Sequence, residues 1–209
     1  MNKKDAVEIV KILRETYPDA TCSLDFKKPF EMVVAVMLSA QCTDERVNLT
    51  TPALFKRCPN IEDYVNIDIK ELEDIIHPCG FYKNKAKNIK LCAKQVLENF
   101  NGVVPNNMDD LLTLAGVGRK SANVILLEVY GIANGIAVDT HAKRISNLMG
   151  LSKESDPSKI EQDLVKIFPK ETLKDINHLF VWHGRNTCIA RKPKCDICTV
   201  NKFCKFYNN

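Results

Sequence analysis

The sequence has no long uninterrupted hydrophobic run. None of its stretches approaches the roughly 18 to 20 apolar residues that a membrane-spanning helix needs. Residues 1–18 alternate charged and apolar positions at helical spacing, so they lack the apolar core of a secretion signal. These absences exclude a membrane protein and predict a soluble, intracellular one.

The pattern of a β-strand is also missing. No run alternates apolar and polar residues with a period of two, and no internal repeat or low-complexity tract occurs. Apolar residues instead recur at intervals of three and four, and proline or glycine follows many of these segments. We expect an all-α fold of about ten helices. Residues 29–40 are apolar on almost every face, which predicts a buried helix.

The excess of positive charge is small overall and concentrated near the C-terminus. A net charge of +4 is too slight to indicate a polyanionic partner. The segment from Arg185 to Lys205, however, contains six Lys and Arg residues and only one acidic residue, Asp196. This segment has the local charge pattern of a nucleic-acid contact.

Nine cysteines without a secretion signal indicate thiols or metal ligands rather than disulfides. Four of them form the pattern C-x6-C-x2-C-x5-C, namely Cys188, Cys195, Cys198 and Cys204. Four thiolates this close together predict a metal site. Both tetrahedral zinc and a 4Fe-4S cluster take four cysteines, and the wide first gap favours the cluster modestly over a zinc ribbon.

The first gap of the cysteine pattern is a basic loop, which contains Arg191, Lys192 and Lys194. Ligands at both ends would restrain it, so its cations could bind DNA phosphates at little cost in ordering. The alternative is an ordinary solvated loop.

A glycine-rich turn lies between two predicted helices, residues 108–114 and 119–130. Its backbone N–H groups, with the start of the second helix, can bind a phosphate oxygen. The residues expected at this contact are Gly116, Val117, Gly118 and Arg119. Lys120 follows in the first helical turn, where the helix dipole favours the neutral amine that nucleophilic attack requires. Similar turns also join helices in proteins that never bind nucleic acid.

Asp139 precedes a helical pattern that extends through Leu148. By itself it is best explained as a helix N-cap, because aspartate is among the residues favoured there. The neighbouring motifs are what favour a catalytic role.

Taken together, these features resemble the endonuclease III family of helix-hairpin-helix DNA glycosylases over nearly the whole sequence. Five blocks carry the resemblance in matching order and spacing: LSAQCTDERVN (38–48), GFYKNKAKNI (80–89), LAGVGRKSANVI (114–125), VDTH (138–141) and HGRNTCIARKPKCDICTVNKFC (183–204). Agreement across five separated blocks is far more specific than any one of them.

The resemblance implies two helical domains with DNA in the groove between them. A six-helix barrel with the hairpin would span residues 22–133, and a cluster domain would join residues 1–21 to 134–209. It implies a 4Fe-4S cluster held by the four cysteines, which organises the basic loop rather than removing the base. The expected partner is damaged double-stranded DNA, bound by a monomer in the cytoplasm or nucleoid.

The resemblance also implies the chemistry. A damaged nucleotide is flipped out of the helix, Asp139 assists loss of the base, and Lys120 attacks the sugar. The resulting Schiff base permits β-elimination, which cuts the strand. Oxidised or saturated pyrimidines are the expected lesions.

Two further segments match residues that enter the DNA. Gln41 would fill the gap left by the flipped nucleotide, and Gly80, Phe81 and Tyr82 would form an opposing wedge. A buried amide and a core aromatic are the alternative. Phe81 replaces a leucine of well-known members, and an aromatic ring can also stack between bases. Ala115 replaces the usual hairpin proline and makes the turn less rigid before binding.

Two other functions remain open. An adenine-specific mismatch glycosylase shares the motifs but has a catalytic glutamate where this chain has Ala35, and it usually lacks the hairpin lysine. A non-enzymatic DNA-binding module with structural zinc would use Lys120 for phosphate contact and Asp139 for capping. His183 shows no ligand spacing, and Trp182 is expected in the core beneath the cluster.

Overall fold

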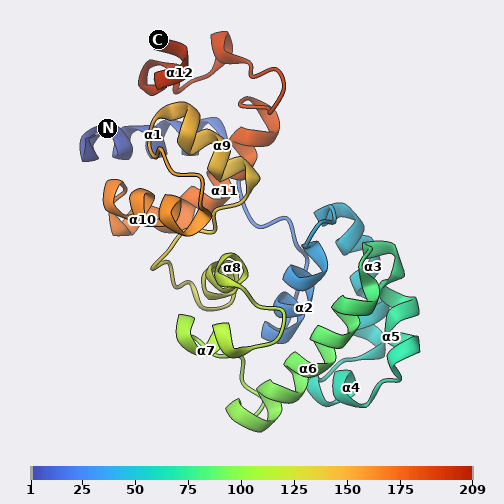
Figure 1. Ribbon diagram of the computed structural model, residues 1–209. Helices are drawn as coiled ribbons and strands as arrows, with labels where there is room; N and C mark the ends of the chain where they lie inside the picture. The colour runs from blue at the N-terminus through green and yellow to red at the C-terminus, as the bar shows by residue number, and fades with distance from the viewer. Residues whose placement is uncertain (1, 209) are drawn as a thin grey trace. The chain divides into compact units, whose positions relative to one another are not determined.

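The structure of the protein is a computed structural model that describes residues 2–208. Twelve α-helices and no β-strand occur within this range (Figure 1). The predicted all-α fold is confirmed, although the periodicity predicts only about ten helices. Some of the helices have only four or six residues, and so few residues contain too little of the apolar repeat to be recognised.

The chain folds into two compact units. One of them, Cys22–Tyr130, is called the central unit below. The other combines the residues up to Thr21 with those from Gly131 onward, and is called the terminal unit. The terminal unit is therefore assembled from two separate stretches of the sequence.

The central unit contains seven α-helices among the described residues: α2 (Pro29–Ser39), α3 (Asp44–Arg57), α4 (Ile61–Asn66), α5 (Ile69–Ile76), α6 (Tyr82–Phe100), α7 (Met108–Thr113) and α8 (Arg119–Tyr130). Helix α2 is buried from Phe30 to Leu38 and packs against α3, α6 and α8. Glu31 caps its first turn by accepting hydrogen bonds from the backbone N–H groups of Lys27 and Lys28, at 2.7 and 3.0 Å. The prediction of a buried helix here is confirmed.

The terminal unit contains α1 (Lys3–Thr16), α9 (Thr140–Met149), α10 (Pro157–Ile167), α11 (Leu173–Asn186) and α12 (Lys205–Asn208). Short 3-10 turns follow α10 and α11, at Lys170–Thr172, Cys195–Ile197 and Asn201–Phe203. The core forms mainly where α9 and α1 pack against α11. These contacts place the segment after α11, which holds the four cysteines, beside α9 and α1.

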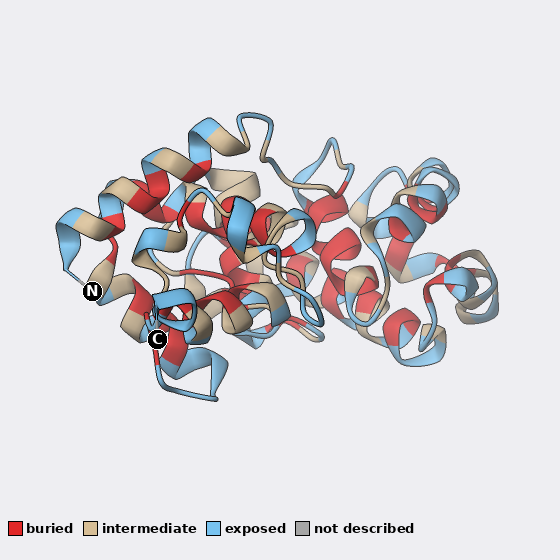
Figure 2. Ribbon diagram, turned by 90° about the horizontal axis from the view of Figure 1, so that it is seen from above, coloured by how far each residue is buried: buried red, intermediate tan, exposed pale blue. Residues whose placement is uncertain are grey.

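Helix α1 shows how an amphipathic sequence becomes part of this core. Asn2 caps it by accepting a hydrogen bond from the backbone N–H of Asp5 at 2.8 Å. Its buried residues recur at the predicted helical spacing: Ala6, Ile9, Val10 and Leu13. Buried and exposed positions alternate around this helix, which begins at the label N in Figure 2.

No helix within residues 2–208 is both long enough and apolar enough to cross a membrane.

Candidate active site and metal centre

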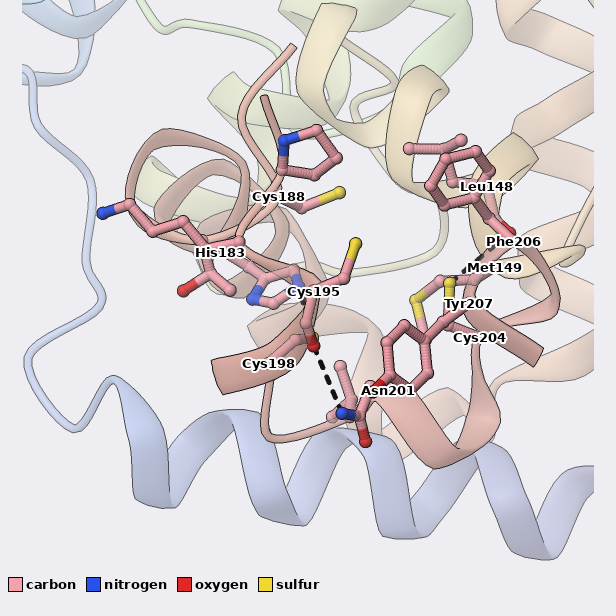
Figure 3. Close-up of a pocket in the computed structure, with 14 residues that line it drawn as sticks. Leu148, Met149, His183, Cys188, Cys195, Cys198, Asn201, Cys204, Phe206 and Tyr207 are labelled. Carbon is pink, nitrogen blue, oxygen red and sulfur yellow. Dashed lines mark hydrogen bonds between the residues drawn. The ribbon is translucent and has the colours of Figure 1, made fainter. Parts of the chain in front are cut away.

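Four cysteines line one pocket of the terminal unit: Cys188, Cys195, Cys198 and Cys204. Cys188 follows α11, and the other three lie at the two 3-10 turns beyond it. Leu148 and Met149 at the end of α9 complete an apolar wall, and Figure 3 shows cysteine sulfurs directed into the shared space. The fold therefore brings together cysteines that are up to 16 positions apart in the sequence, as their spacing predicts.

The donors of this pocket fit an iron-sulfur cluster. Burial raises the pKa of both the Cys188 thiol and the Cys198 thiol, and at Cys188 the charge and hydrogen bond of Arg144 partly offset this effect. Thiolates in such a place need bound cations to neutralise them. No three His, Cys, Asp or Glu side chains of residues 2–208 are arranged as a single-ion site. The four cysteines nevertheless line one pocket, and a 4Fe-4S cluster takes four cysteine ligands.

His183 lies against the pocket from α11, and it is only 2% exposed. Its Nε2 is 3.7 Å from the sulfur of Cys198, and its Nδ1 is 3.1 Å from the hydroxyl of Tyr17. The same hydroxyl lies 2.7 Å from the hydroxyl of Thr187. Burial, followed by the charge of Arg144, lowers the pKa of His183 to about 4, so the ring is neutral at physiological pH.

Arg144 connects α9 to the cysteine segment. Its guanidinium donates to the carbonyl oxygens of Cys188 and Gly184 and lies 3.2 Å from Nδ1 of His141. Gly184 is needed for this close packing, because a Cβ there would lie 2.6 Å from Nδ1 of His141. Helices α9 and α11 are therefore joined by polar contacts that continue into the first cysteine.

The basic loop is held at its base by the backbone. The N–H of Lys194 donates to the carbonyl oxygen of Thr187 at 2.9 Å. The side chains of Arg191, Lys192 and Lys194 are exposed. Three exposed cations therefore lie on a loop whose ends are joined by a backbone hydrogen bond, and restraint by metal ligands stays a prediction.

In the central unit, the glycine-rich turn joins α7 to α8. Gly116 has φ of +77°, in the left-handed region that favours glycine, and a Cβ there would lie 3.0 Å from Cβ of Asn88. Val117 is buried, and its backbone N–H donates a hydrogen bond to the carbonyl oxygen of Leu114. Gly118 and Arg119 are exposed. Helix α8 begins at Arg119, so Lys120 lies in its first turn with an exposed side chain.

In the terminal unit, Asp139 is the N-cap of α9. Its Oδ1 accepts a hydrogen bond from the backbone N–H of Ala142 at 2.7 Å. The prediction that Asp139 is a helix N-cap is therefore confirmed. The capping bond uses one carboxylate oxygen, and the second can serve another function.

Each of the two predicted DNA-insertion segments contains a non-glycine residue with a positive φ. Gln41 has φ of +54° and Phe81 has φ of +46°, and both side chains are exposed. Gly80 also has a positive φ, and the ring of Tyr82 packs against that of His77 with centroids 4.5 Å apart and planes tilted by 41°. Phe81 is 64% exposed, which excludes its alternative role as a core aromatic.

Lys85, a buried residue of α6, connects these two segments. Its ammonium donates to the carbonyl oxygens of Leu38, at 2.8 Å, and Cys79, at 2.9 Å. Leu38 lies three residues before Gln41, and Cys79 lies directly before Gly80, the first residue of the wedge. One cation therefore holds the backbones of both together.

Comparisons with known proteins decide the family. The profile of the HhH-GPD superfamily of base excision DNA repair proteins matches residues 34–170, and that of the iron-sulfur binding domain of endonuclease III matches residues 188–204. An endonuclease III of Synechocystis sp. is 48% identical over 97% of this chain and 92% of its own. The chain belongs to the endonuclease III family.

Solved structures agree with this assignment. A non-covalent endonuclease III-DNA complex is 37% identical, with a TM-score of 0.93 over 100% of this chain and 97% of that one. A trapped endonuclease III-DNA covalent intermediate has the same identity and TM-score, and 98% of that chain is covered. The described residues therefore have the endonuclease III fold.

Membership of the endonuclease III family makes this protein a base-excision repair DNA glycosylase with AP lyase activity. It carries a 4Fe-4S cluster, and it binds DNA. The adenine-specific glycosylase and the zinc-containing binding module are not favoured by these findings.

Two residues that contact the cysteine segment are not indicated by any motif in the sequence. Tyr17 and Arg144 reach the cysteine segment from distant parts of the chain. His183 lies five residues before Cys188, and that proximity is the one available hint to its place. Trp182, expected in the core, is only half-buried.

Proposed function

We propose that this protein excises oxidised pyrimidines from duplex DNA and then cuts the abasic strand, with Lys120 as the nucleophile. The observation that carries the proposal is the exposed Lys120 amine in the first turn of α8, directly after the glycine hairpin. A phosphate bound by the hairpin N–H groups would bring a sugar within reach of this amine. The lysine nitrogen bonds to the sugar C1′ as the base leaves, and the resulting Schiff base permits β-elimination of the 3′ phosphate.

Asp139 is the second proposed catalytic residue. Its negative charge would stabilise the positive charge that develops on the sugar as the base departs, or would help deprotonate Lys120. The capping bond to Ala142 supports this role because it restrains the carboxylate without using both oxygens.

The DNA contacts are proposed for three exposed surfaces. Gln41 would occupy the space of the flipped nucleotide, and Gly80, Phe81 and Tyr82 would enter from the opposite side. The hairpin, at Gly116, Val117, Gly118 and Arg119, would bind one phosphate. The basic loop, at Arg191, Lys192 and Lys194, would bind others and make binding dependent on salt.

We assign the cluster ligands to Cys188, Cys195, Cys198 and Cys204. When bound, the 4Fe-4S cluster supplies structural order to this segment, and excision requires no redox step. Support comes from the shared pocket of the four sulfurs. The central unit would correspond to the six-helix barrel, and the terminal unit to the cluster domain. An intracellular monomer is the form we propose to act on DNA.

Borohydride trapping on a duplex with an abasic site tests the nucleophile. The wild type should form a stable cross-link, Lys120→Ala should form none, and Lys153→Ala, which changes another exposed lysine, should cross-link normally. Absence of trapping by the wild type, or trapping by Lys120→Ala, would reject Lys120 as nucleophile. Excision from a panel of duplexes with defined lesions would test the preference for oxidised pyrimidines.

A further inference from the structure

Gln95, on α6, makes two hydrogen bonds to the entrance of the hairpin. Its side-chain oxygen Oε1 accepts the backbone N–H of Ala115 at 2.7 Å. Its Nε2 donates to the carbonyl oxygen of Thr113 at 3.1 Å. One amide group is thus bonded to the backbone on both sides of Leu114, where α7 ends and the turn begins.

Both backbone groups need partners from outside α7. Thr113 is the last residue of that helix, and the final carbonyl groups of a helix lack intrahelical donors. The N–H of Ala115 lies beyond the helix end. A primary amide offers a donor and an acceptor together, which matches this pair of groups. Its two bonds restrain the chain direction at the entrance of the turn.

Helix α6 supports the hairpin at a second position on the same face. Gly116 packs so closely on Asn88 that a Cβ would lie 3.0 Å from Cβ of that residue. Asn88 and Gln95 are seven residues apart, which is about two helical turns and returns to nearly the same side. The glycine-rich turn therefore lies against one long helix that holds it by packing at Gly116 and by hydrogen bonds at Thr113 and Ala115.

We propose that Gln95 is a positioning residue that holds the hairpin in the conformation that binds DNA. It supplies by hydrogen bonding the restraint that a proline at position 115 would supply covalently. The bond to position 115 requires an N–H, which proline lacks and alanine has. An alanine also gives the unbound turn more conformational freedom to lose on binding, and Gln95 removes that freedom in advance. The inference rests on the DNA contact proposed above for this hairpin.

The test compares Gln95→Leu, Ala115→Pro and the double variant. Amide hydrogen exchange of residues 114–118 measures the restraint without DNA, and affinity for a duplex with a tetrahydrofuran abasic-site analogue measures its use. Gln95→Leu should exchange faster and bind about 3- to 10-fold more weakly, as expected for loss of hydrogen bonds. The rate of base excision at saturating DNA should stay within about twofold. Gln162→Leu, an exposed glutamine of α10, is the matched control and should match the wild type.

The double variant distinguishes positioning from general stability. With proline at position 115, Gln95→Leu should cost less than twofold in affinity, because the turn is already restrained. Unchanged exchange in Gln95→Leu overturns the inference itself. Faster exchange with unchanged affinity instead overturns the proposed DNA contact of the hairpin. If Gln95→Leu lowers affinity equally with alanine and with proline at position 115, the claim that Gln95 and proline are equivalent restraints is overturned.

Discussion

Arg144 holds the carbonyl oxygen of Cys188 with two nitrogens, Nε at 3.0 Å and Nη2 at 2.6 Å. Arg144 belongs to the helix that Asp139 caps, and Cys188 is the first residue of the cysteine segment. The guanidinium also bonds to the carbonyl oxygen of Gly184 at 2.9 Å. The proposed catalytic carboxylate and the metal-binding segment therefore share one rigid connection within the terminal unit.

Replacing Arg144 by glutamine should weaken this connection. We expect the free energy of unfolding to fall by about 2–3 kcal/mol, since charge-assisted bonds to carbonyl groups would be lost. The cluster absorbance near about 400 nm should decay faster in the presence of a chelator. Lys143→Gln, which alters a neighbouring exposed bond to Ser155, is the control. Equal cluster lifetimes in the two variants would contradict the expectation.

Substitutions of Asp139 should separate capping from catalysis. Asparagine is as good an N-cap as aspartate, so Asp139→Asn should retain thermal stability and lose base excision. Asp139→Ala should lose excision and about 1 kcal/mol of stability. Thermal unfolding and single-turnover excision give the two readouts. Wild-type excision by Asp139→Asn would leave this residue with a capping role alone.

Removing the hydroxyl of Tyr17 should change the surroundings of the cluster. Tyr17→Phe breaks the contacts with His183 and Thr187, so the imidazole beside Cys198 loses its polar partner. Hydrogen bonds near cluster sulfurs contribute to the reduction potential, so we expect this potential to shift, as measured by protein-film voltammetry. Tyr207→Phe removes a hydroxyl from the same pocket and should have a smaller effect. A larger shift in the Tyr207 variant would refute this explanation.

Lys85→Met should separate the two DNA-insertion segments. Burial lowers the pKa of Lys85, yet its ammonium is bonded to two backbone carbonyls, which the variant leaves unpaired. We expect a loss of about 1–3 kcal/mol in stability and weaker binding to duplexes with an abasic site. Lys87→Met, an exposed change on the same helix, should be neutral. The prediction fails if both variants bind DNA as the wild type does.

The sequence predicts the local features of this fold and little of what connects them. The buried α2, the start of α8 and the cap at Asp139 depend on residues within a few positions of one another, so periodicity and capping rules identify them. Tyr17 and His183 are 166 positions apart, and no local rule relates them.

Trp182 and His183 show a second limit of sequence patterns. Adjacent residues of a helix differ by about 100° in direction, and apolarity alone favours the tryptophan for the core. The structure buries the histidine instead, because polar partners at Tyr17 and Cys198 satisfy its ring nitrogens. Burial of a polar residue depends on partners that only the folded chain brings close.

The two-part composition of the terminal unit has a consequence for how the protein is made. Helix α1 leaves the ribosome before its packing partner α11, which lies beyond the whole central unit. At about 5–20 residues per second, synthesis of the chain between α1 and α11 takes roughly 8–30 seconds. During that time the apolar face of α1 is without its final contacts. Nascent chains halted after the central unit should therefore expose α1 to chaperones, and they cannot yet receive the cluster, since all four of its proposed ligands are translated later.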